Sequence, residues 1–534
     1  MTPGISGPLQ QAQSAEPERQ GNPMSSILTN NSAMVALQTL KAVNNNLAKT
    51  QGEISTGKSV ASASDNAAVW AISKVMESDV QGFKAISDSL ALGESTLAVG
   101  KKAAEASTDL LTQIKGKIVA AQEENVDRAK IQTDIDALTN QIKSVVGAAQ
   151  FNGKNIVNNS DFTSILSSLD RDSEGNVKSA SISFNGQNLT QTTGSLGTGT
   201  GLTDLSGNVS ATTATLSSAP VRDDGAAVPT NADISLTGDF SADSLSFDIG
   251  GTTVSFAAGD LDTTATTAAG QIAAAINAAQ IEGISVTNNA GTLEFASTRQ
   301  FDATTISVTQ GGASSGTLGA TTVDLAQRAE DFTFSGVNVN KGDGYQINIA
   351  NAGITATYVA SAGDTMEDVA KGLKLAIDAE NNADITTAVS FDSSTNEWTL
   401  KIDNANATAD TVNVVANNDA NDNAVETGRL AGLDGFDVTT KDGAEAALSN
   451  IETLIQRSID SAAEFGSVQG RVETQSDFVS KLTDSLKSGI GALVDADMEE
   501  ASARLQALQV QQQLATQSLS IANQAPQQLL ALFR

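Results

Sequence analysis

The stretch LQALQVQQQLATQSLSIANQAPQQLLALF, residues 505–533, runs for 29 positions without a charged residue. From Ala501, apolar and small residues recur at alternating steps of four and three, at Ala501, Leu505, Leu508, Gln512, Ala515, Leu519 and Ala522. This heptad spacing keeps one side of a helix against a partner helix. The many glutamines argue against a membrane span, which needs a more apolar segment. The stretch therefore predicts an uncharged helix that packs against other helices.

The N-terminal region has the same two properties. Residues 21–40 carry no charge, and the heptad positions we assign there are Ala33, Leu37, Leu40, Asn44, Leu47, Gln51 and Ile54. Further helix is expected to about residue 100, followed by a third segment that holds Leu111, Ile114, Ile118 and then Ile131 to Val145. Helical spacing returns at about residue 444. Both chain ends are thus predicted to be helical and to lie together.

The middle of the chain has a different texture, rich in Thr, Ser, Gly, Asn and Asp, with short alternating runs typical of strands. An approximate repeat places QIAAAINAA, with Ile272, 101 residues before GLKLAIDAE, with Leu373. Each copy reads as two strands, a helix and two strands, at about 240–300 and 335–405. The predicted fold class is α+β: a long antiparallel helical coiled-coil core formed by both termini, with a central β-rich insertion of small outer domains.

The expected domains follow from these changes in texture. Residues 1–23 contain four prolines and no periodicity, which indicates a disordered leader or an extension from an upstream start. Residues 24–157 are expected to form the N-terminal helical core, 158–440 the β-rich insertion and 441–534 the C-terminal helical core.

Composition restricts the chemistry available to the chain. It has no cysteine and no histidine, so disulfides, thiol or Ser-His-Asp catalysis and Cys or His metal sites are excluded. The net charge of −31 opposes binding to nucleic acid or to an anionic membrane surface. No membrane insertion, catalytic residue, metal site or cofactor is expected. The loop that begins Asp419, Asn421, Asn423 resembles an EF-hand start, but Ala424 and Leu430 replace the required Gly and Glu, so we interpret it as a turn.

Uncharged terminal helices suggest burial, because a surface helix in water normally has a charged face. One seam of leucines buries too little to order both ends, so other copies of the chain are expected to complete the burial. A single helical hairpin with fraying, polar ends remains an alternative, because heptads alone indicate only helix pairing.

Five blocks of the sequence resemble bacterial flagellins. ILTNNSAMVALQTL, residues 27–40, resembles the family's opening, and ISTGKSVASASDNAAVWAIS, residues 54–73, resembles its loop, with matches at Asp65 and Ala67. AQFNG at 149–153 and GSVQGRVE at 466–473, which includes Arg471, match two further blocks. The C-terminal block resembles the family's acidic turn, Gln-rich helix and Leu-rich end, with matches at Asp495, Asp497, Ala522, Asn523, Gln524, Pro526 and Leu529. The chain is therefore identified as a member of the flagellin family, similar to flagellins of α-proteobacteria.

The resemblance implies a structural subunit, not an enzyme, that self-assembles into the helical flagellar filament for swimming motility. The residues expected to pack in the filament core are Leu37, Leu40, Leu47, Ile54, Leu505, Leu508, Ala515, Leu519, Ala522, Asn523, Gln524 and Leu529. The implied partners are other flagellin subunits, the flagellar export apparatus, an export chaperone, and junction and cap proteins. The implied location is the extracellular filament, reached through the flagellar secretion system without a cleaved signal peptide.

Departures from the family pattern are local. Val69 and Trp70 replace a Gly-polar pair, and Thr112 and Gln113 stand where many flagellins carry an Arg-Glu pair that a host innate-immune receptor reads. The resemblance therefore implies weak recognition by that receptor.

Two other functions compete with the filament subunit. A hook-filament junction protein shares flagellin-like termini but makes few copies. The second is an enzyme, because the resemblance extends to flagellins that carry a metallopeptidase insert. Such an insert needs two histidines to bind zinc, and this chain has no histidine.

Overall fold

The computed structural model describes residues 30–171, 176–216, 233–312, 315–406 and 408–532. The chain divides into two compact units, one built from residues up to Ser87 and from Phe478 onward, the other from Asp88–Asp477. Two long helices, α2 (Ala67–Ala121) and α6 (Lys441–Val494), contribute to both units. The fold is mixed, with helical terminal regions and a β-rich centre, as the sequence predicts.

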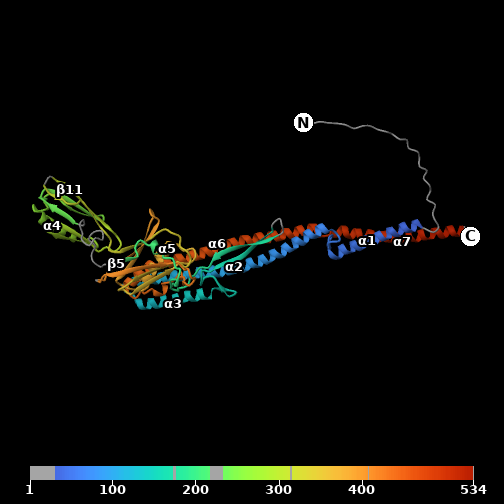
Figure 1. The fold of residues 1–534 in the computed structure, drawn as a ribbon, viewed down its shortest axis with the longest axis horizontal. Helices are drawn as coiled ribbons and strands as arrows, with labels where there is room; N and C mark the ends of the chain where they lie inside the picture. The colour runs from blue at the N-terminus through green and yellow to red at the C-terminus, as the bar shows by residue number, and fades with distance from the viewer. Residues whose placement is uncertain (1–29, 172–175, 217–232, 313–314, 407, 533–534) are drawn as a thin grey trace, which may run out of the picture. The chain divides into compact units, whose positions relative to one another are not determined.

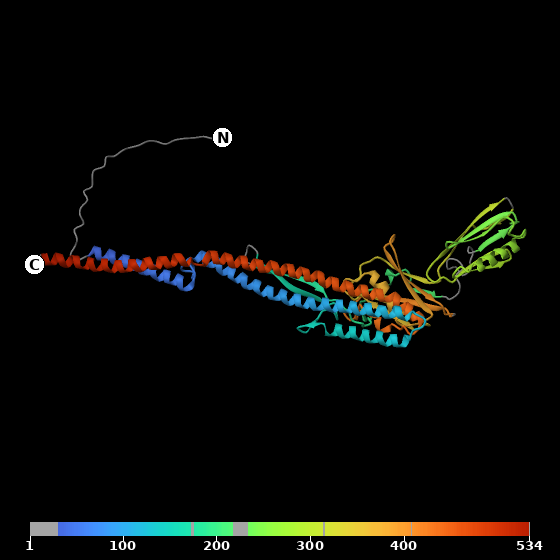
Figure 2. The same ribbon diagram turned by 180° about the vertical axis from the view of Figure 1, so that it is seen from behind.

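The first unit is helical. Its α1 (Asn31–Thr56) lies beside α7 (Met498–Leu532), as Figure 1 shows and as the reverse view in Figure 2 repeats. The side chain of Asn30 caps α1 by accepting the amide N–H of Ala33 at 3.0 Å. Gly57 ends α1 with φ of +69°, a left-handed conformation that glycine adopts without steric cost.

The helices of the second unit form a packed core. Helix α2 runs antiparallel to α6, since Thr108 bonds to Ser458 at 3.0 Å while Lys115, further along α2, pairs with Glu452, further back along α6. Apolar side chains between the helices, such as Leu111 and Phe465, are fully buried. Helix α3 (Arg128–Ala148) also belongs to this unit.

The predicted boundary between the second and third helices is wrong. Leu111, Ile114 and Ile118 lie on α2, which continues to Ala121 instead of ending near residue 100. The break falls at QEENVD, residues 122–127, where the Asp127 carboxylate accepts the amide N–H of Lys130 at 3.2 Å and starts α3. Apolar periodicity runs through both helices, so the polar cap, not the periodicity, marks the break.

Two hairpins follow α3. The first joins β1 (Gln150–Phe151) to β2 (Lys154–Asn155) through Asn152 and Gly153, both with positive φ, as a tight two-residue hairpin turn requires. The second pairs β3 (Phe162–Arg171) with β4 (Val177–Asn185).

The β-rich centre contains two modules. We name residues 233–325 the first module, and its elements in order are β6 (Asp233–Thr237), β7 (Asp243–Ile249), β8 (Thr252–Phe256), α4 (Ala265–Ala278), β9 (Ile284–Asn289), β10 (Thr292–Ser297), β11 (Thr304–Gly312), β12 (Thr317–Leu318) and β13 (Thr322–Leu325). Its sheets have the strand orders β12-β6-β10-β9 and β13-β11-β7-β8. One apolar cluster includes residues of both sheets and of α4.

Residues 330–417 form the second module, completed by a segment from earlier in the chain. Its elements are β14 (Glu330–Phe334), β15 (Gly344–Ile349), β16 (Ile354–Val359), α5 (Met366–Asp378), β17 (Ile385–Asp392), β18 (Glu397–Asn404) and β19 (Asp410–Asn417), with η1 (Ser206–Asn208) and β5 (Thr213–Leu216) from the earlier segment. The sheet orders are β14-β18-β17 and β16-β15-β19-β5.

The two modules share one topology. In each, the first, fifth and fourth strands make one sheet and the sixth, second and third make the other. In the first module the downstream segment 317–325 supplies an edge strand to both sheets. In the second module the upstream segment 208–216 occupies the same place, because Val209 bridges to Phe334 and β5 pairs with β19. The first module is therefore inserted between the second module and its own closing segment.

A charged clamp lies where the chain enters the second module. Arg328 donates to both carboxylate oxygens of Asp403, at 2.7 and 2.6 Å, and the Asp403 side chain is fully buried. The Lys401 ammonium donates to the carbonyl of Phe301 at 3.1 Å and to the side chain of Gln327. These bonds hold residues 326–329, the segment that joins the two modules.

Candidate polymerisation surface

Helices α1 and α7 pair in antiparallel fashion over their whole common length. Asn30 donates to the carbonyl of Ala522 at 2.8 Å, Gln512 donates to the side chain of Asn44 at 2.8 Å, and Lys58 bridges to Asp495. Residue numbers rise along one helix as they fall along the other. The two ends of the sequence are therefore direct neighbours.

The predicted seam of α7 agrees with the burial of its side chains. All seven heptad positions from Ala501 to Ala522 are buried or half-buried, whereas the other positions in that range are exposed. Leu508 and Ala515 are 7% and 8% exposed. Asn523 and Gln524 are exposed, and the side chains of Pro526 and Leu529 lie outside the described residues.

The predicted seam of α1 is half correct. Leu40, Leu47 and Ile54 are half-buried, but the heptad positions between them, Leu37, Asn44 and Gln51, are exposed. The buried residues lie one position earlier, at Ala36, Val43 and Thr50. Seam positions spaced by three and then four residues fit a helix nearly as well as positions spaced by four and then three. The prediction placed the larger Leu37 in the seam instead of Ala36, which is the wrong phase. The smaller side chains at the buried positions let α1 and α7 approach each other closely.

A loop connects the seam to the junction between α6 and α7. The amide of Ser59 donates to the carbonyl of Val494 at 2.7 Å, and the amide of Ala496 donates to the carbonyl of Gly57 at 3.0 Å. Asp497 begins α7 by accepting the amide N–H groups of Glu499 and Glu500 at 2.9 and 3.2 Å. These contacts give the acidic turn at residues 495–497 a structural role.

Asp65 organises the same loop. Its carboxylate accepts the amide N–H groups of Ala61 and Ser62 and the hydroxyl of Ser62, at 3.1, 2.9 and 3.0 Å. The bonds from Ser62 lower the pKa of Asp65. Ala67 is the first residue of α2 directly after this loop, whereas Arg471 lies exposed on α6 in the second unit.

Helix α7 also exposes a second apolar face, which the sequence analysis missed. Val510, Leu514 and Ile521 are 56%, 58% and 68% exposed. At 100° per residue they fall within about 40° of one another, while Leu508 and Ala515 lie about 140° to 160° from Val510. We name these three residues the outer stripe. Their helical spacing in the uncharged stretch is a signal that could have found them.

Helix α1 shows a similar excess of exposed apolar surface. Met34, Val35 and Leu37 are 61%, 64% and 44% exposed. Isolated exposed apolar residues are ordinary, but a cluster within the charge-free stretch that ends at Leu40 indicates contact with another macromolecule. Both terminal helices thus present apolar side chains beyond those that they bury against each other.

The expected turn after β19 is built from the residues that resemble a calcium loop. Asp419 accepts the amide N–H groups of Asn423 and Ala424 at 2.9 and 3.1 Å, and Asn421 donates to the carbonyl of Thr198 at 2.9 Å. Within the described residues, no group of three or more Asp or Glu side chains is arranged to hold a metal ion. The described helices also include none that is long and apolar enough to cross a membrane.

Comparisons with known proteins agree with the architecture of the two ends. Residues 27–161 match the family model for the bacterial flagellin N-terminal helical region, and residues 448–533 match that for the C-terminal helical region. Flagellin A of Rhizobium meliloti is 32% identical over 512 residues, which cover 96% of this chain and 100% of the relative. Flagellin B of the same organism is 31% identical over the same shares of both chains. The chain belongs to the flagellin family and is a subunit of the flagellar filament.

Solved structures of junction proteins also resemble the chain, at low scores. Flagellar hook associated protein-3 of Legionella pneumophila is 11% identical, with a TM-score of 0.27, over 79% of this chain and 98% of that one. The FlgL protein of Xanthomonas campestris is 9% identical, with a TM-score of 0.25, over 77% and 97%.

Proposed function

We propose that the chain polymerises through its two terminal helices, which form the inner core of the filament as an antiparallel coiled coil. The observation that carries the proposal is the outer stripe of α7. One face of this helix meets α1, and the opposite face exposes Val510, Leu514 and Ile521. A helix with two apolar faces and, from Leu505 to Leu532, no charged side chain has a place for further helices, and identical contacts that do not close produce a helical filament.

The remaining core positions take part in the same packing. Leu40, Leu47, Ile54, Leu505 and Leu519 support the seam within one subunit. Leu37, Asn523 and Gln524 face neighbouring subunits, whereas the side chain of Leu529, also expected in the core, lies outside the described residues. The polar residues among them pair with each other where a charge would be desolvated at a cost of several kcal/mol.

The two ends become ordered on assembly, which prevents premature polymerisation. A single helix pair of 26 and 35 residues buries few large apolar side chains against the conformational entropy of both ends. Neighbouring copies supply the missing burial. The leader expected at residues 1–23 lies outside the described residues, and the β-rich region 158–440 lies on the filament surface.

Export precedes assembly. The chain travels unfolded through the flagellar secretion system to the extracellular filament without a cleaved signal peptide, helped by an export chaperone. Junction and cap proteins lie at the two ends of the polymer. Thr112 and Gln113, both exposed on α2, weaken recognition by the host flagellin receptor.

Seeded growth tests the proposed function. Purified full-length chain and a chain ending at Arg504 are incubated with short filament seeds, then followed by sedimentation and negative-stain microscopy. Long filaments from the full-length chain and none from the truncated chain are expected. Growth of both would exclude a role for α7, and growth of neither would favour the junction protein.

A further inference from the structure

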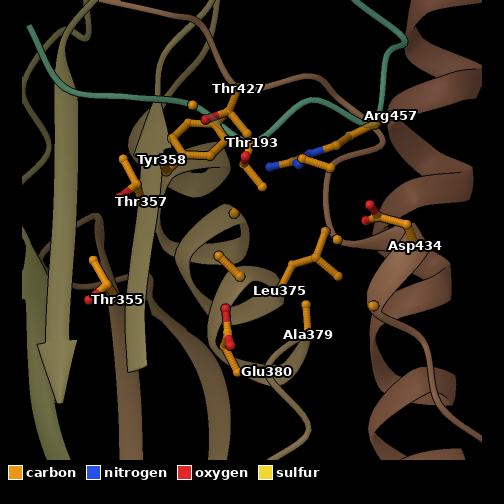
Figure 3. A pocket seen from close by; sticks show the side chains of 16 residues that line it. Thr193, Thr355, Thr357, Tyr358, Leu375, Ala379, Glu380, Thr427, Asp434 and Arg457 are labelled. Carbon is orange, nitrogen blue, oxygen red and sulfur yellow. The ribbon is translucent and has the colours of Figure 1, made fainter. Parts of the chain in front are cut away.

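The helix of the second module is covered on its outer side by other parts of the chain. The backbone at Gly432 lies so close to Leu375 of α5 that an added Cβ would come within 2.8 Å of its side chain, and Gly435 approaches Ala379 in the same way at 2.7 Å. Arg457 of α6 donates to the carbonyl of Asp368 at 2.9 Å. Figure 3 shows Leu375 and Ala379 directed toward the chain that carries Asp434, with Arg457 above them.

A cavity of about 420 Å³ remains within this contact. Arg457 stacks over the ring of Tyr358 at 5.5 Å, and burial raises the pKa of the Tyr358 hydroxyl. Charged side chains along α5 make further bonds to α6, since Lys374 donates to Asn450 at 2.7 Å. The outer face of α5 is thus in contact with α6 and with the turn that contains Gly432 and Gly435.

Helix α4 is the counterpart of α5 in the first module. The same topology and the offset of 101 residues place Thr267, Gln271, Ala274 and Ala278 at the positions of Asp368, Gly372, Leu375 and Ala379. The inner residues correspond as well, because Ile272 and Ile276 are buried like Leu373 and Ile377. The outer residues do not share the same environment. Within the described residues, Thr267, Gln271, Ala274 and Ala278 are exposed. We name these four residues the α4 face.

The α4 face also lacks the charges expected of a helix in water. Residues 263–281 include no charged side chain, in a chain whose net charge is −31. An isolated surface helix normally carries charge on its outer side. The counterpart α5 has Glu367, Asp368, Lys371, Lys374 and Asp378. A charge-free face of small side chains permits close approach by another backbone, as Gly432 and Gly435 approach α5.

We propose that the α4 face is a contact surface for a second copy of this chain, the neighbouring subunit in the filament. This inference rests on the proposed function, because the filament holds copies of the outer modules at high local concentration. The repeated fold shows which side of the module helix accepts a partner. Because the chain is strongly acidic, two copies repel each other except where neither carries charge, which favours contact at the α4 face.

The absence of natural cysteine makes the test direct. Ala274→Cys places one thiol on the α4 face, and Thr253→Cys on the exposed strand β8 gives a matched control in the same module. Each full-length variant is treated with a maleimide-linked polyethylene glycol as monomer and as sedimented filament. A benzophenone maleimide on the same thiol is then photolysed in filaments mixed from light and heavy-isotope subunits, and mass spectrometry identifies the partners.

We expect the thiol at 274 to react in the monomer and to lose its reactivity in filaments, with light-to-heavy crosslinks, while the thiol at 253 reacts in both. Reaction at 274 in filaments would overturn the proposal. Protection already in the monomer, or crosslinks only within one chain, would also overturn it by assigning the α4 face to a segment of the same chain. Failure of the unmodified chain to form filaments would instead refute the proposed function.

Discussion

Replacing Ile521 by alanine tests the outer stripe of α7 separately from the seam. The side chain is 68% exposed in the single chain. Full burial of an isoleucine stabilises by about 1.5 to 3 kcal/mol, so covering the exposed part in the polymer contributes roughly 1 to 2 kcal/mol per subunit. Loss of that amount raises the critical concentration for filament growth by roughly 5- to 30-fold.

The assay is seeded growth at a series of subunit concentrations, with the polymer separated by sedimentation. Gln511→Ala is the matched control, because it is an exposed position on the same helix and removes little apolar area. It should leave the critical concentration nearly unchanged. Circular dichroism of the monomers should show the same thermal transition for both variants. An Ile521→Ala chain that polymerises at the wild-type concentration would refute burial of the outer stripe.

Three further substitutions test other parts of the account. Arg328→Met leaves Asp403 buried without its partner, which should destabilise the β-rich region by about 3 to 5 kcal/mol in thermal or urea unfolding; an unchanged transition would contradict the clamp. Asp65→Asn should remove a pH dependence of filament stability: because the folded pKa is lowered, the carboxylate stabilises the loop above its ordinary value of 3.8, and this is lost as the pH falls through the lowered pKa. Identical acid-dissociation curves for wild type and Asp65→Asn would exclude that role. Gly432→Ala, at φ of +86° and against Leu375, should lower the melting temperature of the monomer, and unaltered melting would show that the contact is loose.

Heptad spacing predicted α7 better than α1 for a physical reason. In α7 the alternative phase would place Arg504 and Ser518 in the seam instead of Leu505 and Leu519, so only one phase is apolar. In α1 the competing phases place Leu37 or Ala36 in the seam, and both are apolar. The choice depends on how closely the partner helix approaches, which spacing along one helix does not specify.

The repeated modules show a different limit. The internal repeat predicted two strands, a helix and two strands in each copy, and the structure has these elements at 243–297 and 344–404. The strands that close each module could not be predicted from the repeat, because the second module takes β5 from a segment more than a hundred residues before β14. Pairing between distant segments depends on the whole fold, and short strands such as Thr213–Leu216 carry little pattern of their own.

The outer stripe could have been predicted from Val510, Leu514 and Ile521, which recur at helical spacing. The heptad seam masks it, because a single apolar face already explains the pairing of one helix with another. The α4 face required the structure, since its meaning depends on the covered counterpart α5.

Hydrogen exchange tests most directly the central claim that the terminal helices become ordered by burial in the polymer. Amide exchange along residues 31–56 and 498–524 is compared between monomers and sedimented filaments of the full-length chain by mass spectrometry. The account predicts rapid exchange in the monomer and strong protection in the filament, with the second unit protected in both. Equal protection of the terminal helices in monomer and filament would contradict it.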